Sequence, residues 1–293
     1  MINLTFFDRS GNDNISKDYR SIGYNVRLIR FPDGFAQIRF YEDVLTMSDG
    51  SNKFYYYQPI EPFSGKRVKE VNDFDKISKT DPLELRNISL ARTKRKINEY
   101  AHSVLWDYFA TFTFNPQKIN RSNYELCRKR LCRWLGYLRK MHSPDLKYLI
   151  VPELCKDMES WHFHGLFKDI GNLDLIDSGI IKNGIQIYNI RNWHYGFSTI
   201  SQIKRDDIYA VCHYISKYMT KECHAMTHGT HRYYVSHGLP MPEKSIAFLE
   251  RGEEEQFIQK VEKKYHMKTV RVVKSEENYT GIVYVDLEPI LPD

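Results

Sequence analysis

Residues 146–167 read LKYLIVPELCKDMESWHFHGLF, two short apolar segments on either side of a polar connection. Side chains alternate between the two faces of a strand, so His162 and His164 share one face while Phe163 points to the other. A short connection turns the second strand back beside the first and brings Glu153 next to the histidine pair. The sequence therefore predicts two paired strands that carry two imidazoles and a carboxylate on one face.

The neighbouring segments extend this pattern into an α+β fold. The strand-like segment DYFATFTF (107–114) comes before the pair, and helices are expected over 123–142 and 206–221. The first of these helices carries an apolar stripe suited to covering a sheet: Leu126, Leu131, Trp134, Leu135 and Leu138. Helices interleaved with tightly connected strands predict a central, mostly antiparallel sheet flanked by helices.

The two ends of the chain predict additions to this centre. A Pro-Asp-Gly turn divides residues 24–44 into a β-hairpin, and 83–102 forms a basic amphipathic helix. Residues 242–265 look helical, and the segments KTVRVVKSEEN and TGIVYVDLEP look like a terminal strand pair. We therefore expect three regions, an N-terminal hairpin and basic helix, a central domain and a C-terminal extension: 1–100, 101–240 and 241–293.

Composition indicates the compartment and the partner. Over 293 residues the formal charge is +6, which favours polyanions and makes nucleic acid the first partner to test. Five cysteines without a C-x-x-C pair fit neither a disulfide framework nor a zinc module. No apolar run reaches the roughly 20 residues that span a bilayer, and there is no signal peptide. We expect a cytoplasmic protein without a membrane partner, and the missing G-x-x-x-x-G-K-[ST] loop makes an ATP-driven motor unexpected.

The histidine pair could form part of a metal site. A lone H-x-H is more often structural, so its context decides. Two imidazoles and one carboxylate leave open positions for water and a phosphate oxygen, a mixed set that suits Mg²⁺ or Mn²⁺. Glu153 is the expected third ligand, but Asp157 and Glu159 lie in the connection and could replace it.

The helix over 206–221 carries a repeated unit of tyrosine and lysine. Tyr214 and Tyr218 are four residues apart, and Lys217 and Lys221 each follow a tyrosine by three, so all four can share one face. A phenol titrates near 10 and needs nearby positive charge to act as a nucleophile at neutral pH. Standing alone, such a helix would more often be an aromatic core stripe with lysines that reach solvent.

The order of three motifs gives the context. FATFTFNP (109–116), VPELCKDMESWHFHGLF (151–167) and YISKYMTK (214–221) together resemble the signature of HUH endonucleases, and in particular rolling-circle replication initiators of the two-tyrosine phage and plasmid type. GIQIYNIRNWHYGFSTISQI (184–203) and RYYVSHGL (232–239) are also similar to that group. The resemblance covers roughly residues 85 to 240.

The resemblance implies a fold and a reaction. The fold would be an HUH or RRM-like palm, with Thr111 and Thr113 in the strand beneath the site. His162, His164 and Glu153 match the metal ligands, whereas Tyr214 and Tyr218 match the paired nucleophiles. The protein would then nick and rejoin single-stranded DNA at a replication origin hairpin through a 5′-phosphotyrosine. A host helicase and polymerase in a bacterial cytoplasm would complete rolling-circle replication.

DNA contacts are expected from basic and aromatic side chains. Trp161 or Tyr195 could stack on bases. Eight cations on the helices before and after the first motif could neutralise phosphates, although solvated surface charge is the plainer interpretation for each: Arg92, Lys94, Arg95, Lys96, Arg128, Lys129, Arg130 and Arg133.

Other functions remain open at this point. A tyrosine transposase or relaxase shares the chemistry, but the double-tyrosine helix favours replication. A metal-dependent hydrolase lacks the further ligands of a two-metal site, and a non-catalytic nucleic-acid-binding protein could retain the fold. A zinc site is a weaker alternative, because no paired cysteine motif completes its four candidate ligands: Cys223, His224, His228 and His231.

Overall fold

The fold is described from a computed structural model of the chain. The described residues are 22–47, 56–57, 82–155, 157, 159–222, 231–275 and 281–290. They form two compact units, one from Pro82 to Met241 and the other from segments on both sides of it. No helix among the described residues is long and apolar enough to cross a membrane.

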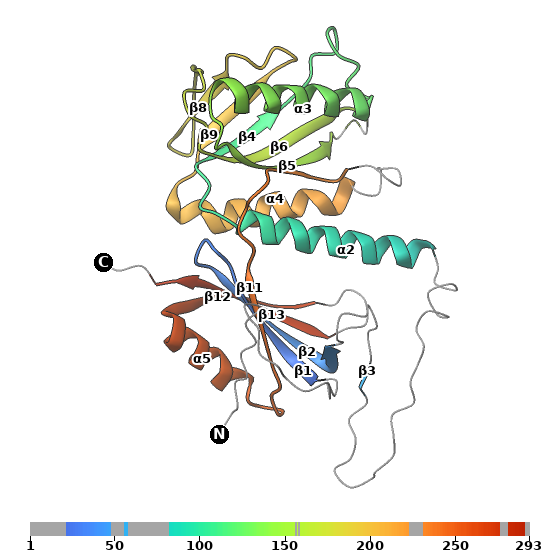
Figure 1. Cartoon of the computed structure of the whole chain (residues 1–293), viewed down its shortest axis with the longest axis vertical. Coiled ribbons are helices and arrows are strands. Elements are labelled where there is room, and N and C mark those ends of the chain that lie inside the picture. The colour runs from blue at the N-terminus through green and yellow to red at the C-terminus, as the bar shows by residue number, and fades with distance from the viewer. Residues whose placement is uncertain are drawn as a thin grey trace, which may run out of the picture. The chain divides into compact units, whose positions relative to one another are not determined.

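The unit over residues 82–241 is built on a seven-stranded antiparallel sheet with the order β10-β5-β6-β4-β9-β8-β7. Its strands are β4 (Tyr108–Phe112), β5 (Lys147–Leu154), β6 (Trp161–Lys168), β7 (Leu175–Lys182), β8 (Ile185–Ile190), β9 (Ser198–Gln202) and β10 (Tyr234–Val235). Its helices are α2 (Pro82–Ala101), α3 (Tyr124–Met141), η1 (Arg205–Asp207) and α4 (Ile208–Glu222). In Figure 1, α3 covers one face of the sheet, and α4 with α2 beside it lies on the other. The expected α+β class and mostly antiparallel sheet are therefore confirmed.

Helix α3 has a defined start and one buried stripe. Asn123 caps it by accepting a hydrogen bond from the Leu126 backbone N–H. The buried side chains recur at helical spacing: Cys127, Leu131, Trp134, Leu135 and Leu138. The Trp134 ring packs at 4.9 Å from Phe112 of β4 and at 5.4 Å from Trp193. This aromatic core joins α3 to the middle of the sheet.

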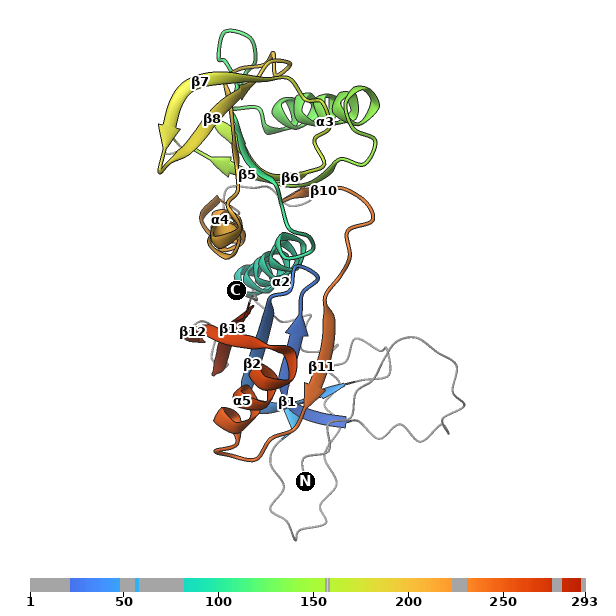
Figure 2. The same ribbon diagram turned by 90° about the vertical axis from the view of Figure 1, so that its left-hand side faces the viewer.

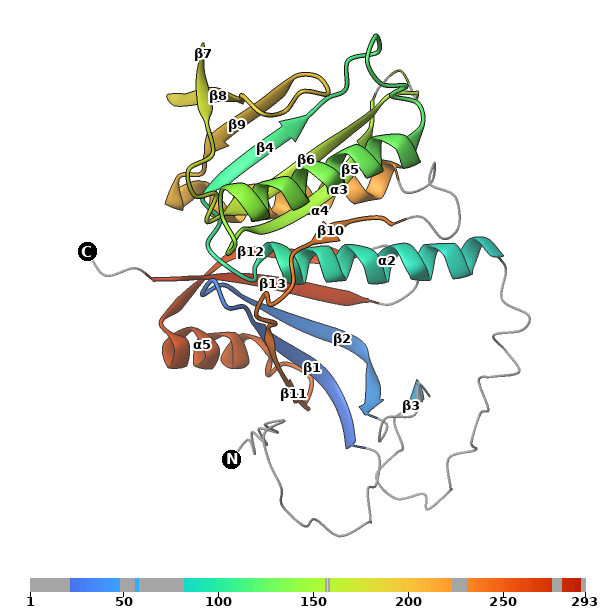
Figure 3. The same cartoon turned by 45° about the horizontal axis from the view of Figure 1, so that its top comes forward.

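Strands β7, β8 and β9 were not expected from the sequence. Asn183 and Gly184 both have positive φ, which suits the two-residue turn of a hairpin, and the pair joins β7 to β8. Figure 2 shows β7 and β8 as a two-stranded arm, and Figure 3 shows β9, β4, β6 and β5 side by side. The Asn-Gly turn between alternating apolar residues was a readable signal for this hairpin.

The second unit combines both ends of the described chain in one antiparallel sheet. Its strands are β1 (Ile22–Arg30), β2 (Ala36–Met47), β3 (Tyr56–Tyr57), β11 (Glu243–Ala247), β12 (Met267–Ser275) and β13 (Ile282–Pro289), in the order β11-β1-β2-β13-β12 with β3 beside β2. Helix α5 (Glu254–Tyr265) buries Phe257 and Val261 in the same core as Ile38 and Leu287. The hairpin over 24–44 and the terminal strand pair are therefore confirmed.

Two expectations about the chain ends need correction. The helix predicted over 242–265 is wrong in its first half, because residues 243–247 pair with β1 and α5 begins only after Gly252, whose φ of +88° interrupts a helix. The expected regions 1–100 and 241–293 also differ from the two units. Helix α2 belongs with the central sheet, and β13 pairs with β2, so strands from both ends share one sheet.

Candidate active site

The histidine pair and Glu153 lie on one face of the paired strands β5 and β6. In the antiparallel register Glu153 is opposite His162, and Val151 is opposite His164. Residues directly opposite each other share a face, so both imidazoles and the carboxylate project the same way. The Glu153 carboxylate contacts Nε2 of His164. The placement expected from the sequence is thus confirmed, and the roles of these residues stay a prediction.

His164 is held on three sides by groups from neighbouring strands. Thr111 of β4 is its register partner, and the Thr111 hydroxyl lies 3.1 Å from Nδ1. The Phe109 ring stacks against the imidazole at 5.9 Å. With Nε2 against Glu153, both ring nitrogens have a partner, and the ring is fixed in orientation. Such outer contacts are typical of histidines that bind metal ions.

The three side chains suit a divalent cation by chemical type. Burial and the neighbouring His164 lower the pKa of His162, which favours the neutral imidazole that a metal requires. Among the described residues, no choice of one ligand atom from each keeps all three within 4.8 Å of one another. His162 therefore has to turn toward the His164 and Glu153 contact for one ion to touch all three.

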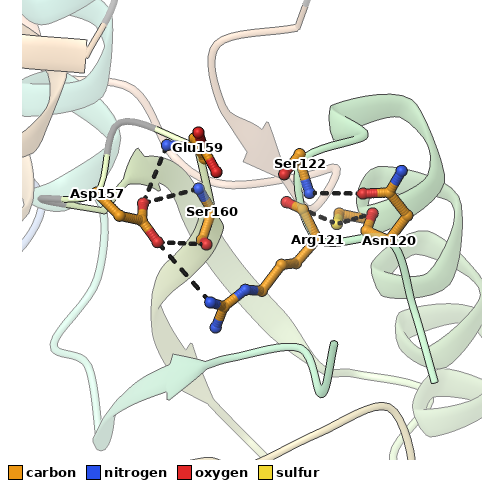
Figure 4. A network of polar contacts seen from close by, with 7 residues as sticks. Asn120, Arg121, Ser122, Asp157, Glu159 and Ser160 are labelled. Atoms are coloured by element: carbon orange, nitrogen blue, oxygen red, sulfur yellow. Dashed lines mark hydrogen bonds and ion pairs between the residues drawn. The ribbon is translucent and has the colours of Figure 1, made fainter. Parts of the chain in front are cut away.

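The loop between β5 and β6 bears on the choice of third ligand. The Asp157 carboxylate accepts hydrogen bonds from the backbone N–H groups of Glu159 and Ser160 and from the Ser160 hydroxyl at 2.6 Å (Figure 4). Arg121 lies 3.9 Å away across the ion pair. These hydrogen bonds, led by that of Ser160, lower the pKa of Asp157 to about 2. Because Asp157 is engaged in closing its loop, the geometry favours Glu153 as the third ligand.

Tyr214 of α4 approaches the same cluster. Its ring meets that of Phe109 edge-on at 5.7 Å, and Phe109 in turn stacks on His164. Burial and the charge of Glu153 raise the pKa of the Tyr214 phenol. The side chain is 46% exposed, because the buried positions of α4 lie on the adjacent face. The structure therefore brings Tyr214 toward the histidine pair while leaving it accessible.

Several predicted residues lie where the structure gives no side-chain description. Tyr218, Lys217 and Lys221 follow Tyr214 within α4, but their side chains are outside the described part of the chain. The zinc alternative falls largely outside the described residues as well: Cys223, His224 and His228. Their roles remain predictions from the sequence.

The eight predicted DNA-contacting cations divide between the two faces of the sheet. Arg92, Lys94, Arg95 and Lys96 are exposed on α2, which lies on the same side as α4. Arg128, Lys129, Arg130 and Arg133 lie on α3, which covers the face opposite the histidines. Arg128 is paired with Glu125 at 2.8 Å, and the Arg130 guanidinium lies over the Tyr195 ring. The α2 group is therefore the better placed for DNA at the histidine face.

The two rings expected to stack on bases are packed within the protein. Trp161 is 7% exposed and lies 4.8 Å from Tyr124. Tyr195 is half-buried between Arg130 and Trp193. The sequence had indicated aromatic residues near the motifs, but alternation alone did not show which rings would be covered.

Two neighbours of the site were missed by sequence reasoning. Phe109 contacts both His164 and Tyr214, and its position in the alternating FATFTF segment could have placed it on their face. Arg121 is 41% exposed in its side chain, and its backbone carbonyl accepts a hydrogen bond from Trp161 N–H. Nothing in the local sequence signals Arg121, because the contact joins two loops that are distant along the chain.

Comparison with known proteins gives one match. Residues 107–223 match a family model of replication-associated proteins of the ORF2 type, a span that includes β4, the histidine pair and Tyr214. No curated protein and no solved structure matches the chain. The match supports a replication initiator of the Rep type, and such a protein binds DNA.

Proposed function

We propose that this chain is a rolling-circle replication initiator that nicks and rejoins single-stranded origin DNA by means of a tyrosine nucleophile. The observation that carries the proposal is the continuous set of contacts from Tyr214 through Phe109 to His164 and Glu153. A phenol, an imidazole pair and a carboxylate on one sheet face are the groups needed for phosphoryl transfer to a tyrosine.

His162, His164 and Glu153 would hold a divalent cation, Mg²⁺ or Mn²⁺. Bound there, the cation would polarise the scissile phosphate as a Lewis acid and orient it. Thr111 would keep the His164 ring in place, as its contact with Nδ1 indicates. The loop closed by Asp157 would hold β5 and β6 at a fixed separation, because Cys155 N–H also donates to the Ser160 carbonyl.

The tyrosine would carry out a transesterification. The Tyr214 oxygen attacks phosphorus, the phenolic proton passes to solvent, and the bond from phosphorus to the 3′-oxygen of the DNA breaks. The products are a 5′-phosphotyrosyl link and a 3′-hydroxyl that a polymerase can extend. Since burial and Glu153 raise the pKa of Tyr214, the phenol needs positive charge nearby, which Lys217 and Lys221 on the same helix are suited to supply.

The second tyrosine gives the cycle a way to end. Tyr218 lies one helical turn after Tyr214 and would attack the regenerated origin, so that the displaced strand is released as a circle. Neither exchange needs ATP, because the phosphotyrosine link conserves the bond energy. Unwinding and synthesis would come from a host helicase and polymerase in the cytoplasm of a bacterial cell.

A covalent adduct tests the proposal. The protein is incubated with single-stranded candidate origin DNA and Mn²⁺, and the mixture is run on a denaturing gel. We expect a protein–DNA adduct that is lost in the double variant Tyr214→Phe with Tyr218→Phe, and loss in only one single variant would name the first nucleophile. Tyr137→Phe is the matched control, because Tyr137 is 45% exposed on α3, behind the sheet. An adduct that survives the double variant would overturn the tyrosine mechanism.

A further inference from the structure

Four residues form a row across the strands at the level of the histidine pair. Glu153 of β5 is opposite His162 of β6. Thr111 of β4 is opposite His164, so the register continued by two residues sets Thr113 opposite His162. The backbone N–H of Thr113 donates to the Phe197 carbonyl at 2.9 Å, just before β9 begins. The row therefore runs Glu153, His162, Thr113, Phe197.

Phe197 lies on the same face as the histidines. In β9, Ser198 and Ile200 are buried opposite Phe112 and Ala110, which belong to the face covered by α3. Side chains alternate along a strand, so Phe197 points the other way. That face carries the imidazoles, and the Phe197 side chain is 55% exposed there, more than Tyr214.

The position of Phe197 is fixed by its backbone. The Thr113 hydroxyl accepts from Phe197 N–H at 3.2 Å and donates to the Phe197 carbonyl at 2.9 Å. The preceding residue must be glycine, because a Cβ on Gly196 would lie 2.3 Å from the Thr113 carbonyl oxygen. An apolar ring is thus held firmly in solvent beside the candidate metal ligands.

We propose that Phe197 is a stacking platform for a base of the single-stranded DNA next to the scissile phosphate. Adjacent strands are about 4.8 Å apart, so Phe197 lies roughly 10 Å from His162 along the row. A base attached next to a phosphate held at His162 can reach that position. Stacking on an aromatic ring does not depend on base identity and would hold the strand in place for attack. This inference rests on the proposed nicking function.

Binding of DNA with and without bases tests the stacking. The probes are oligothymidylate of about 16 nucleotides and an abasic oligomer of the same length, which keeps the phosphates but offers no base. Binding is measured by fluorescence anisotropy in EDTA, so that no cleavage intervenes. We expect Phe197→Ala to bind oligothymidylate roughly 10-fold more weakly and to bind the abasic oligomer unchanged, whereas Phe197→Trp retains binding.

The matched control is Phe248→Ala, because Phe248 is also 55% exposed but belongs to the other unit. Equal losses on both oligomers, or no loss in Phe197→Ala, would overturn the stacking proposal, and the exposed ring would then be a candidate protein contact. No binding of oligothymidylate by the unaltered protein would also overturn it. The adduct assay is independent: an adduct formed normally by Phe197→Ala would leave the nicking function standing while the stacking role fails.

Discussion

The two faces of the central sheet differ in what the same strands present. On β4, Phe112 points to α3 and packs against Trp134 and Trp193, whereas Thr111 points to the other face and contacts His164. On β6, Phe163 is fully buried while His162 is only half-buried. One face is thus a tightly packed aromatic core and the other carries the reactive groups. The difference teaches that the core holds the site in place, because each strand belongs to both.

The largest expected effect comes from breaking the core face. Phe112→Ala removes a fully buried ring in contact with Trp134 and Phe167. We expect the free energy of unfolding to fall by about 3–5 kcal/mol. Urea denaturation followed by tryptophan fluorescence measures it, and adduct formation should fall along with the fraction folded. A loss below about 1 kcal/mol would show that α3 does not depend on this contact.

A smaller and different effect is expected one residue away. Thr111→Val removes the hydroxyl that contacts His164 Nδ1 but keeps the side-chain volume. We expect affinity for Mn²⁺ to fall by about 10- to 100-fold with little change in unfolding free energy. Calorimetric titration with Mn²⁺ measures the first and urea denaturation the second. If stability falls and Mn²⁺ affinity does not, the threonine belongs to the core and not to the site.

The smallest effect concerns Asp157, at the edge of the site face. Asp157→Asn should leave Mn²⁺ affinity nearly unchanged, while Glu153→Gln lowers it, because the Asp157 oxygens are engaged within their loop. The carboxyl itself should titrate with a pKa of about 2 in an NMR pH series, below its ordinary 3.8. Since the folded pKa is depressed, the loop is stabilised above about pH 4 and loses that contribution as the pH falls through about 2. Titration at the ordinary value would mean that the hydrogen bonds do not hold in solution.

Local patterns made one part of the site predictable. Alternation placed His162 and His164 on one face, and the short connection brought Glu153 beside them, as the register confirms. The antiparallel sheet with flanking helices followed from the same reasoning. Period and turn chemistry are visible along the chain, so pairing of adjacent strands can be derived from them.

The remainder depends on contacts between distant segments. Nothing local shows that α3 would cover the face opposite the histidines, and so four of the predicted DNA-contacting cations lie behind the sheet. The exposure of Phe197 and the covering of Tyr195 follow from a loop anchored at Thr113, which no periodicity indicates. The β7 and β8 hairpin is a different case, since its Asn183–Gly184 turn could have been recognised.

The pairing of β2 with β13 has a consequence for synthesis at the ribosome. Residues 82–241 are continuous, so their sheet can form as soon as they have emerged. The other sheet has to wait, because β2 meets its neighbour only when Ile282–Leu287 is made. Until then one edge of the β1–β2 hairpin stays open, an aggregation risk of the kind that chaperones relieve. The half-built sheet at the beginning of the chain is therefore the last part of the described protein to be finished.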